Sequence, residues 1–227
     1  TKRKAQLLYS VEQGVLRDIF DNPSAPDTVQ RTEQVAQHTV AFLLQGPDVL
    51  HHLIRIMSDD YATFTHSINV CILSVSLATE LGITSRDQLD NLATGTLLHD
   101  IGKSELPKSI LKKRGPLNHE EFELVRQHVV FGERLLHADP RMNAERMLPL
   151  SQHHERLDGT GYPRRLTDSQ IHLYGRIAAV ADSFDAMTSE RTYQGAMRAF
   201  EAITILRGRL REQYDQEVLE GLIQILA

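Results

Sequence analysis

The chain has 227 residues, of which 41% are hydrophobic and 24% charged, a composition typical of a soluble globular protein. Its net charge of −5 argues against a binder of nucleic acid polymers, which usually carries a basic face. The single cysteine, Cys71, excludes an internal disulfide and fits a reducing compartment, so we expect the cytoplasm. No stretch approaches the roughly 18 uninterrupted apolar residues of a membrane span.

Apolar periodicity and breaker residues predict an all-α chain. Residues 1–46 contain two polar amphipathic helices, 2–20 and 27–45, which we interpret as an N-terminal connector or the tail of an upstream region. Gly46 and Pro47 then mark a boundary, and 47–227 forms the main domain. Its longest irregular stretch, 155–171, is a candidate functional loop. The helices expected in this domain are 48–57, 59–81, 86–99, 118–137, 142–154, 172–188, 196–212 and 215–226.

Five of the eleven histidines stand in contexts that suggest metal binding. His66 lies within an apolar helix, His99 precedes Asp100, and two others are adjacent to each other. The remaining six fit ordinary surface positions. The five candidates are His66, His99, His128, His153 and His154.

Two aspartates strengthen this interpretation. Asp100 follows two leucines and Asp182 lies in an apolar helix, so both are expected in the interior. A buried carboxylate must be paired or bound to a metal, because desolvating it alone costs several kcal/mol. Nitrogen and carboxylate ligands suit zinc, iron, manganese or nickel. The set is large enough for two ions, an arrangement that recurs in the hydrolysis of phosphate esters.

The motifs around these residues resemble those of the HD-GYP domain family, a group of HD-superfamily metal-dependent phosphohydrolases. The resemblance covers roughly residues 47–227 and implies an HD-domain helical bundle. Members of this family typically hydrolyse the cyclic dinucleotide cyclic di-GMP to linear pGpG or GMP, using iron, manganese or related metals. The matching segments are His-Asp-Ile-Gly-Lys at 99–103, His-His-Glu-Arg-Leu-Asp-Gly-Thr-Gly-Tyr-Pro at 153–163, Ala-Asp-Ser-Phe-Asp-Ala-Met at 181–187 and Arg-Thr-Tyr at 191–193.

The resemblance implies a binuclear site in which Asp100 bridges two divalent ions. Iron or manganese is expected, with nickel or zinc as alternatives. Some members hold a third metal through a glutamate one turn before the first histidine, where this chain has Ala62, so we predict two metals. One ion would be held by His66, His99, Asp100 and Asp182, and the other by Asp100, His128, His153 and His154.

The resemblance also implies roles in catalysis and substrate binding. A hydroxide bridging the two ions would attack the phosphorus, with Asp100 and Lys103 as the catalytic residues and Lys103 aimed at the phosphate. Tyr162 and Arg191 would contact the substrate. Glu155 is expected to orient a ligand histidine, and Asp185 to fix Lys103 by a charge-assisted hydrogen bond.

The chain departs from the family at two positions: Gln194 stands where a basic residue is common, and Arg165 where glycine is common. Two alternatives stay open. One is a module that senses a cyclic dinucleotide or docks a GGDEF-type cyclase, although its intact ligand set argues against pure sensing. The other is an HD hydrolase of nucleoside phosphates or cyclic GMP-AMP. Pairing of the N-terminal helices between chains would give a homodimer.

Overall fold

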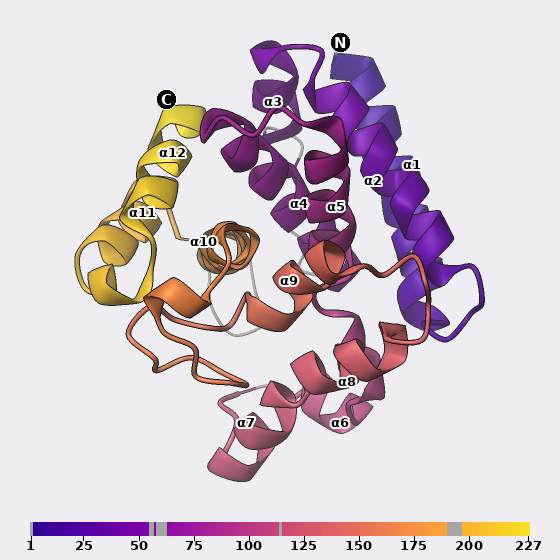
Figure 1. Cartoon of the computed structure of the whole chain (residues 1–227), viewed down its shortest axis with the longest axis vertical. Helices are drawn as coiled ribbons and strands as arrows, with labels where there is room; N and C mark the ends of the chain where they lie inside the picture. Colours follow the sequence, from indigo (N-terminus) through magenta and orange to yellow (C-terminus); the bar gives the residue numbers. More distant parts are fainter. Residues whose placement is uncertain (1, 55–56, 58–62, 114, 190–196) are drawn as a thin grey trace.

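A computed structural model of the chain describes residues 2–54, 57, 63–113, 115–189 and 197–227. Helices make up the regular structure of these ranges, which contain no strand and one isolated bridge between Asp158 and Thr167 (Figure 1). The prediction of an all-α fold is therefore confirmed. None of the described helices is long and apolar enough to cross a membrane.

The N-terminal helices α1 (Lys2–Asp21) and α2 (Thr28–Leu43) lie side by side along one flank of the molecule (Figure 1). The buried positions of α1 recur every three or four residues, the spacing of one helix face. This face packs against α4, while α2 packs against α5, and both helices contribute to the same hydrophobic core as the rest of the chain. The boundary at Gly46 stays a prediction. The buried positions of α1 are Ala5, Tyr9, Glu12, Leu16 and Ile19.

The centre of the bundle is formed by α4 (Thr63–Glu80) and α10 (Leu173–Thr188), the second of which Figure 1 shows nearly end-on. Every residue of α4 from Thr65 to Ala78 is buried, because α1, α5 (Arg86–Leu97), α10 and α12 (Gln216–Leu226) surround it. Its apolar sequence on most sides is the pattern of such an enclosed helix. Smaller elements complete this part: α3 (Pro47–Ile54), α11 (Ala199–Arg207) and the 3₁₀ turn η3 (Arg211–Gln213).

The single helix expected over 118–137 is two helices, α7 (His119–Arg126) and α8 (His128–Leu136), that meet at Gln127. A capping box between Asn118 and Glu121 starts α7. No proline or glycine marks the break in the sequence, which is why periodicity alone missed it. The break lies beside a tertiary contact, where a Cβ at Gly102 would be 1.9 Å from the carbonyl oxygen of His128.

The elements that the sequence analysis missed are short ones: η1 (Ile101–Glu105), α6 (Lys108–Leu111) and η2 (Asp168–Gln170). The helix expected over 196–212 ends at Arg207, and the separate turn η3 follows it. The 3₁₀ helix η1 continues from α5 and packs on α8. Helix α9 (Ala144–Gln152) packs on both α5 and α10. As a result, the ends of α5 and α9 and the start of α8 meet near the first turn of α4 and the middle of α10.

Candidate metal centre

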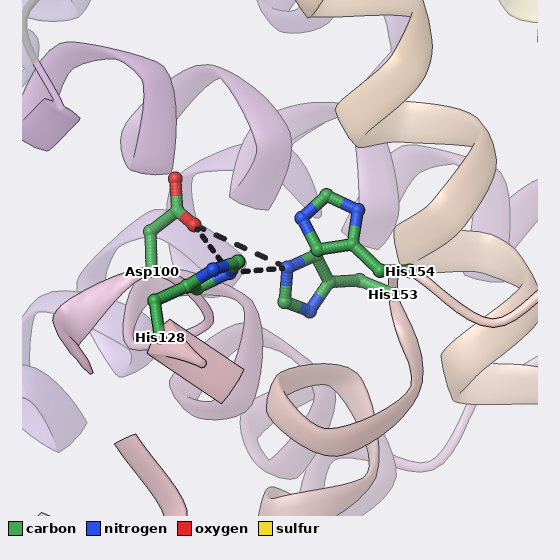
Figure 2. A group of neighbouring side chains, drawn as sticks. All are labelled: Asp100, His128, His153 and His154. Atoms are coloured by element: carbon green, nitrogen blue, oxygen red, sulfur yellow. Dashed lines mark hydrogen bonds and ion pairs between the residues drawn. The ribbon is translucent and has the colours of Figure 1, made fainter. Parts of the chain in front are cut away.

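The structure brings all seven predicted ligand residues together in two adjacent groups. Their positions follow from the fold, because one comes from the first turn of α4, one from α10, and the others from helix ends. Within each group the ligand atoms lie within 4.8 Å of one another. One group is His66, His99 and Asp182; the other is Asp100, His128, His153 and His154 (Figure 2).

Asp100 lies between the two groups and turns one oxygen to each. Its Oδ2 is 3.4 Å from Nε2 of His99 and 3.9 Å from Nε2 of His66. Its Oδ1 is 3.3 Å from Nε2 of His128 and 4.0 Å from Nε2 of His153, as Figure 2 shows. The side chain is 1% exposed. A carboxylate so placed can serve two cations at once.

Four ring nitrogens of the buried histidines face outward and hydrogen-bond to acceptors. Backbone carbonyls accept hydrogen bonds, so Nδ1 of His99, His128 and His153 carries the proton and their Nε2 keeps its lone pair toward the centre. His66 differs, because both of its ring nitrogens face carboxylates: Nδ1 faces Asp185, and Nε2 faces Oδ1 of Asp182 at 3.0 Å. In all four rings Nε2 is the nitrogen that a metal ion would use. The Nδ1 bonds are His66 to Asp185 Oδ2 (2.6 Å), His99 to Thr96 O (2.6 Å), His128 to Val125 O (2.7 Å) and His153 to Pro149 O and Leu150 O (both 3.0 Å).

Two buried atoms at the centre have no hydrogen-bond partner in the part of the chain that the structure describes: Nε2 of His99 and Oδ1 of Asp100. The 3.3 Å approach of His128 to Asp100 lacks the angles of a hydrogen bond. An unsatisfied buried carboxylate oxygen and an unsatisfied imidazole lone pair are each costly. A divalent cation in the His66 group would satisfy Nε2 of His99, and one in the His128 group would satisfy Oδ1 of Asp100, so the donor set fits divalent metal ions.

The protonation states of the two aspartates agree with the binding of divalent metal ions. Burial alone would raise the pKa of Asp100, but the Lys103 ammonium and the neighbouring His99 outweigh it and hold that pKa well below its usual range. Burial is likewise opposed at Asp182, where hydrogen bonding to His66 and the nearby His154 lower the pKa. The centre therefore presents two carboxylates as anions.

Desolvation acts in the opposite sense on the paired histidines. Burial, followed by the charge of a neighbouring histidine, lowers the pKa of both His153 and His154 well below the usual value. Both rings are thus neutral at neutral pH and able to bind a metal.

The hydrogen bonds of Lys103 and Asp185 differ from the expected pair. Lys103 in η1 donates to Oδ2 of Asp100 at 2.5 Å, with about a fifth of its side chain exposed. Asp185 instead accepts from Nδ1 of His66 and from Nδ2 of Asn69 at 2.9 Å. The carboxylate of Asp185 therefore orients a histidine, and the lysine lies directly against the carboxylate that separates the two groups.

Tyr162 forms the rim of the centre. Its ring stacks on His154 with centroids 4.6 Å apart and an angle of 28°, and the Arg126 guanidinium lies 4.5 Å from the Tyr162 centroid. Glu123 holds Arg126 at 2.7 Å. Sequence reasoning missed Arg126; the only signal was its position two residues before His128.

Glu155 holds the loop rather than a histidine ring. Its buried carboxylate accepts from the backbone N–H of Arg164 at 2.7 Å and of Leu166 at 2.9 Å. The expected role, orientation of a ligand histidine, is therefore replaced by fixing the segment that carries Tyr162. Arg165, which stands where the family often has glycine, adopts a φ of 53°, in the left-handed region that glycine tolerates best.

Several sequence predictions lie outside the described residues. Arg191, expected to contact substrate, and Gln194, one of the departures from the family, fall in 190–196. Ala62, on which the prediction of two rather than three metals rests, falls in 58–62. These three assignments stay predictions.

Fold and site together define an all-helical domain built around a buried histidine–aspartate cluster suited to divalent metals. The HD domain family matches residues 50–218, more than half of the chain, and the protein therefore belongs to this family. The resemblance to HD-GYP domains found in the sequence is confirmed.

Three comparisons illustrate this kinship. Cyclic di-GMP phosphodiesterase PA4108 of Pseudomonas aeruginosa is 38% identical over 225 residues, which cover 98% of this chain but 54% of that protein. 3'3'-cGAMP-specific phosphodiesterase 3 of Vibrio cholerae is 37% identical over 165 residues, covering 72% of this chain and 35% of its own length. The chain thus spans about half, or less, of these relatives. Bd1817, an HDG"Y"P protein from Bdellovibrio bacteriovorus, shares the fold with a TM-score of 0.85 at 22% identity, covering 99% of this chain and 72% of that one.

Proposed function

We propose that this domain is a metal-dependent phosphodiesterase that hydrolyses cyclic di-GMP to linear pGpG, GMP or both. The observation that carries the proposal is the carboxylate of Asp100, which turns one oxygen to each of two groups of inward-facing ligand atoms. The 38% identity to a protein named for this activity supports the choice of substrate.

In this proposal the two groups hold two divalent ions, iron or manganese, with Asp100 shared between them. Such ions, when bound, lower the pKa of a coordinated water and neutralise phosphoryl oxygens. Mixed imidazole and carboxylate ligands suit these metals. The first ion is assigned to His66, His99, Asp100 and Asp182, and the second to Asp100, His128, His153 and His154.

The surrounding residues bind and orient the substrate. Lys103, partly exposed beside Asp100, supplies a positive charge toward the phosphate, and Arg126 adds a second cation at the rim. Tyr162 stacks on His154 and forms part of the rim at this end of the centre. Glu155 fixes the loop that carries Tyr162, and Arg191 is assigned a substrate contact on the basis of the resemblance alone.

A second candidate substrate is 3'3'-cGAMP, because a relative at 37% identity is named for it. Both substrates present the same phosphodiester to the centre and differ in one purine base. Docking of a GGDEF-type cyclase, a homodimer and a cytoplasmic location stay predictions from the sequence.

Elemental analysis of anaerobically purified protein, coupled to product chromatography, tests the function. We expect two ions per chain and linear dinucleotide or mononucleotide as product, with cyclic di-GMP and 3'3'-cGAMP assayed in parallel. Asp100→Ala should lose both metal and turnover, whereas Asp21→Ala, which removes an exposed carboxylate at the end of α1, should lose neither. An Asp100→Ala variant with full metal and full turnover would overturn the proposal. Metal-loaded wild type that binds the dinucleotide without hydrolysing it would identify a sensor.

A further inference from the structure

Helix α1, interpreted from the sequence as a connector, reaches the candidate metal centre through a continuous line of hydrogen bonds. The phenol of Tyr9 donates to Oδ1 of Asn69 at 2.6 Å, and Nδ2 of Asn69 donates to Oδ1 of Asp185 at 2.9 Å. The other oxygen of Asp185 accepts from Nδ1 of His66 at 2.6 Å. Three helices, α1, α4 and α10, thus supply one line of contacts that ends on a candidate ligand.

Each link of this line fixes the orientation of the next. The carboxylate of Asp185 only accepts, so the NH₂ end of the Asn69 amide faces Asp185 and the Oδ1 end faces Tyr9, whose phenol donates to it. Asp185 accepts two hydrogen bonds, one on each oxygen: Oδ1 accepts from Asn69, and Oδ2 accepts from the Nδ1–H of His66. The Nε2 of His66 is thereby directed at Asp182, whose Oδ1 lies 3.0 Å away. Hydrogen bonds of this kind orient metal-binding histidines and tune their affinity.

The line is buried along its whole length. Tyr9 is 5% exposed, and Asn69, Asp185 and His66 are each 1% exposed. Removal of one link therefore leaves the buried polar group next to it without its protein partner.

Two further contacts fix α1 along the same face of α4. Nε2 of Gln13 donates to Oγ1 of Thr65 at 3.3 Å, and the Arg17 guanidinium lies 5.0 Å from the Phe64 ring centroid. Tyr9, Gln13 and Arg17 are four residues apart, which places them on one side of α1. A shift of α1 therefore moves the contacts of α4 on both sides of His66.

We propose that Tyr9 and Asn69 are positioning residues for the ion assigned to His66, His99 and Asp182, so that the placement of α1 sets the affinity for that ion. The inference rests on the metal centre of the proposed function. It makes α1 part of the site, and any region joined to α1 acquires a direct path to one ion and not the other.

Titration of Mn²⁺ into metal-free protein, followed by calorimetry, tests this assignment on the whole chain. Wild type should show two binding events. Asn69→Leu, which keeps the branching of the side chain but removes both hydrogen bonds, should weaken one event by roughly 10–100-fold, the range for loss of a partner behind a ligand. Tyr9→Phe, a milder change that keeps the buried ring, should weaken the same event by several-fold, and the other event should stay within about twofold.

Tyr174→Phe is the matched control, because it also removes a buried tyrosine hydroxyl, which there donates to the backbone carbonyl of Gln88 at 3.1 Å. It should leave both events unchanged. Thermal unfolding of each protein in chelator separates a loss of folding stability from a loss of affinity. The inference is overturned if Tyr9→Phe and Asn69→Leu leave both events unchanged, or weaken both events equally. If wild type binds two ions but hydrolyses no cyclic dinucleotide, the proposed activity is refuted. The same titration would still decide whether Tyr9 and Asn69 are positioning residues.

Discussion

The histidines of the candidate metal centre are held in two different ways. His128 and His153 in one group, and His99 in the other, donate Nδ1–H to backbone carbonyls three or four residues earlier in the chain. His66 donates to Asp185, which is 119 positions away. Three ring orientations therefore depend on local backbone, while the fourth depends on the packing of separate helices.

The local arrangement has a simple origin in helix geometry. The last carbonyls of an α-helix lack a partner within the helix. Thr96, Val125 and Pro149 all lie in the last turn of α5, α7 and α9, and a histidine just past each end donates to them. These bonds add to the backbone N–H bonds that the same carbonyls accept, such as the one from His153 to Pro149 at 3.1 Å, and they leave Nε2 available for a metal. His66 lies in the first turn of α4 and relies on a carboxylate instead.

The largest expected effect comes from removing one histidine from each group. His66→Ala and His128→Ala should each reduce kcat/KM by more than the roughly 100-fold expected for loss of an outer hydrogen bond, because each removes a direct ligand. Elemental analysis should show one ion lost in each variant. His38→Ala, an exposed histidine on α2, should behave as wild type. If either variant lost both ions, the groups would form a single cooperative site and the comparison between them would fail.

A smaller effect is expected where η1 approaches α8. A methyl group at Gly102 would lie 1.9 Å from the carbonyl oxygen of His128, so Gly102→Ala must push η1 away from α8. Overpacking of this kind costs about 1–3 kcal/mol of unfolding free energy. Because Asp100 immediately precedes η1, the affinity of the His128 group should fall more than that of the His66 group.

Thermal unfolding measures the stability lost in Gly102→Ala, and Mn²⁺ titration measures the change in its metal affinity. Gly14→Ala makes the same chemical change on α1 at a position with no neighbour within 4 Å of the added methyl, and should stabilise the helix by about 0.5–1 kcal/mol. Unchanged stability and unchanged binding in Gly102→Ala would show that η1 does not fix the position of Asp100.

The distinction between local and long-range partners also explains how much of this site the sequence predicts. The ligand residues occur in motifs and at helix ends, so residue type and spacing identified all seven positions that the structure brings together. The residues that hold or flank the ligands through tertiary contacts are not marked by a motif or a spacing in the sequence. Tyr9 and Asn69 lie 60 positions apart and meet only because α1 packs on α4, and Arg126 faces Tyr162 only because the chain turns at Gln127. The same turn, set by tertiary contact rather than by a breaker residue, hid the division between α7 and α8.

The last expected effect is a pH dependence of stability that arises from Glu12, which lies on the buried face of α1. Its carboxyl is 3% exposed and accepts from the hydroxyl of Thr39 on α2 at 2.8 Å. Burial raises its pKa from 4.5 to about 8, although the bond from Thr39 opposes the shift. Between these two values the folded state binds a proton that the unfolded state releases. Unfolding free energy should therefore fall as pH rises through this range, by up to about 1.4 kcal/mol per pH unit.

Glu12→Gln replaces the acid with a neutral group of the same shape and should remove this dependence. The difference in unfolding free energy between variant and wild type should be flat below pH 4.5, grow in favour of the variant from about pH 5 to pH 8, and level off above. Glu120→Gln, the same change at an exposed position of α7, should show no such growth. Chemical denaturation at four pH values measures the curve. Because Glu12 bonds to α2 rather than to Asn69, both Mn²⁺ affinities should match wild type at pH 6, where Glu12 is protonated. A change in the affinity of the His66 group alone would mean that the anchorage of α1 to α2 also reaches the metal centre.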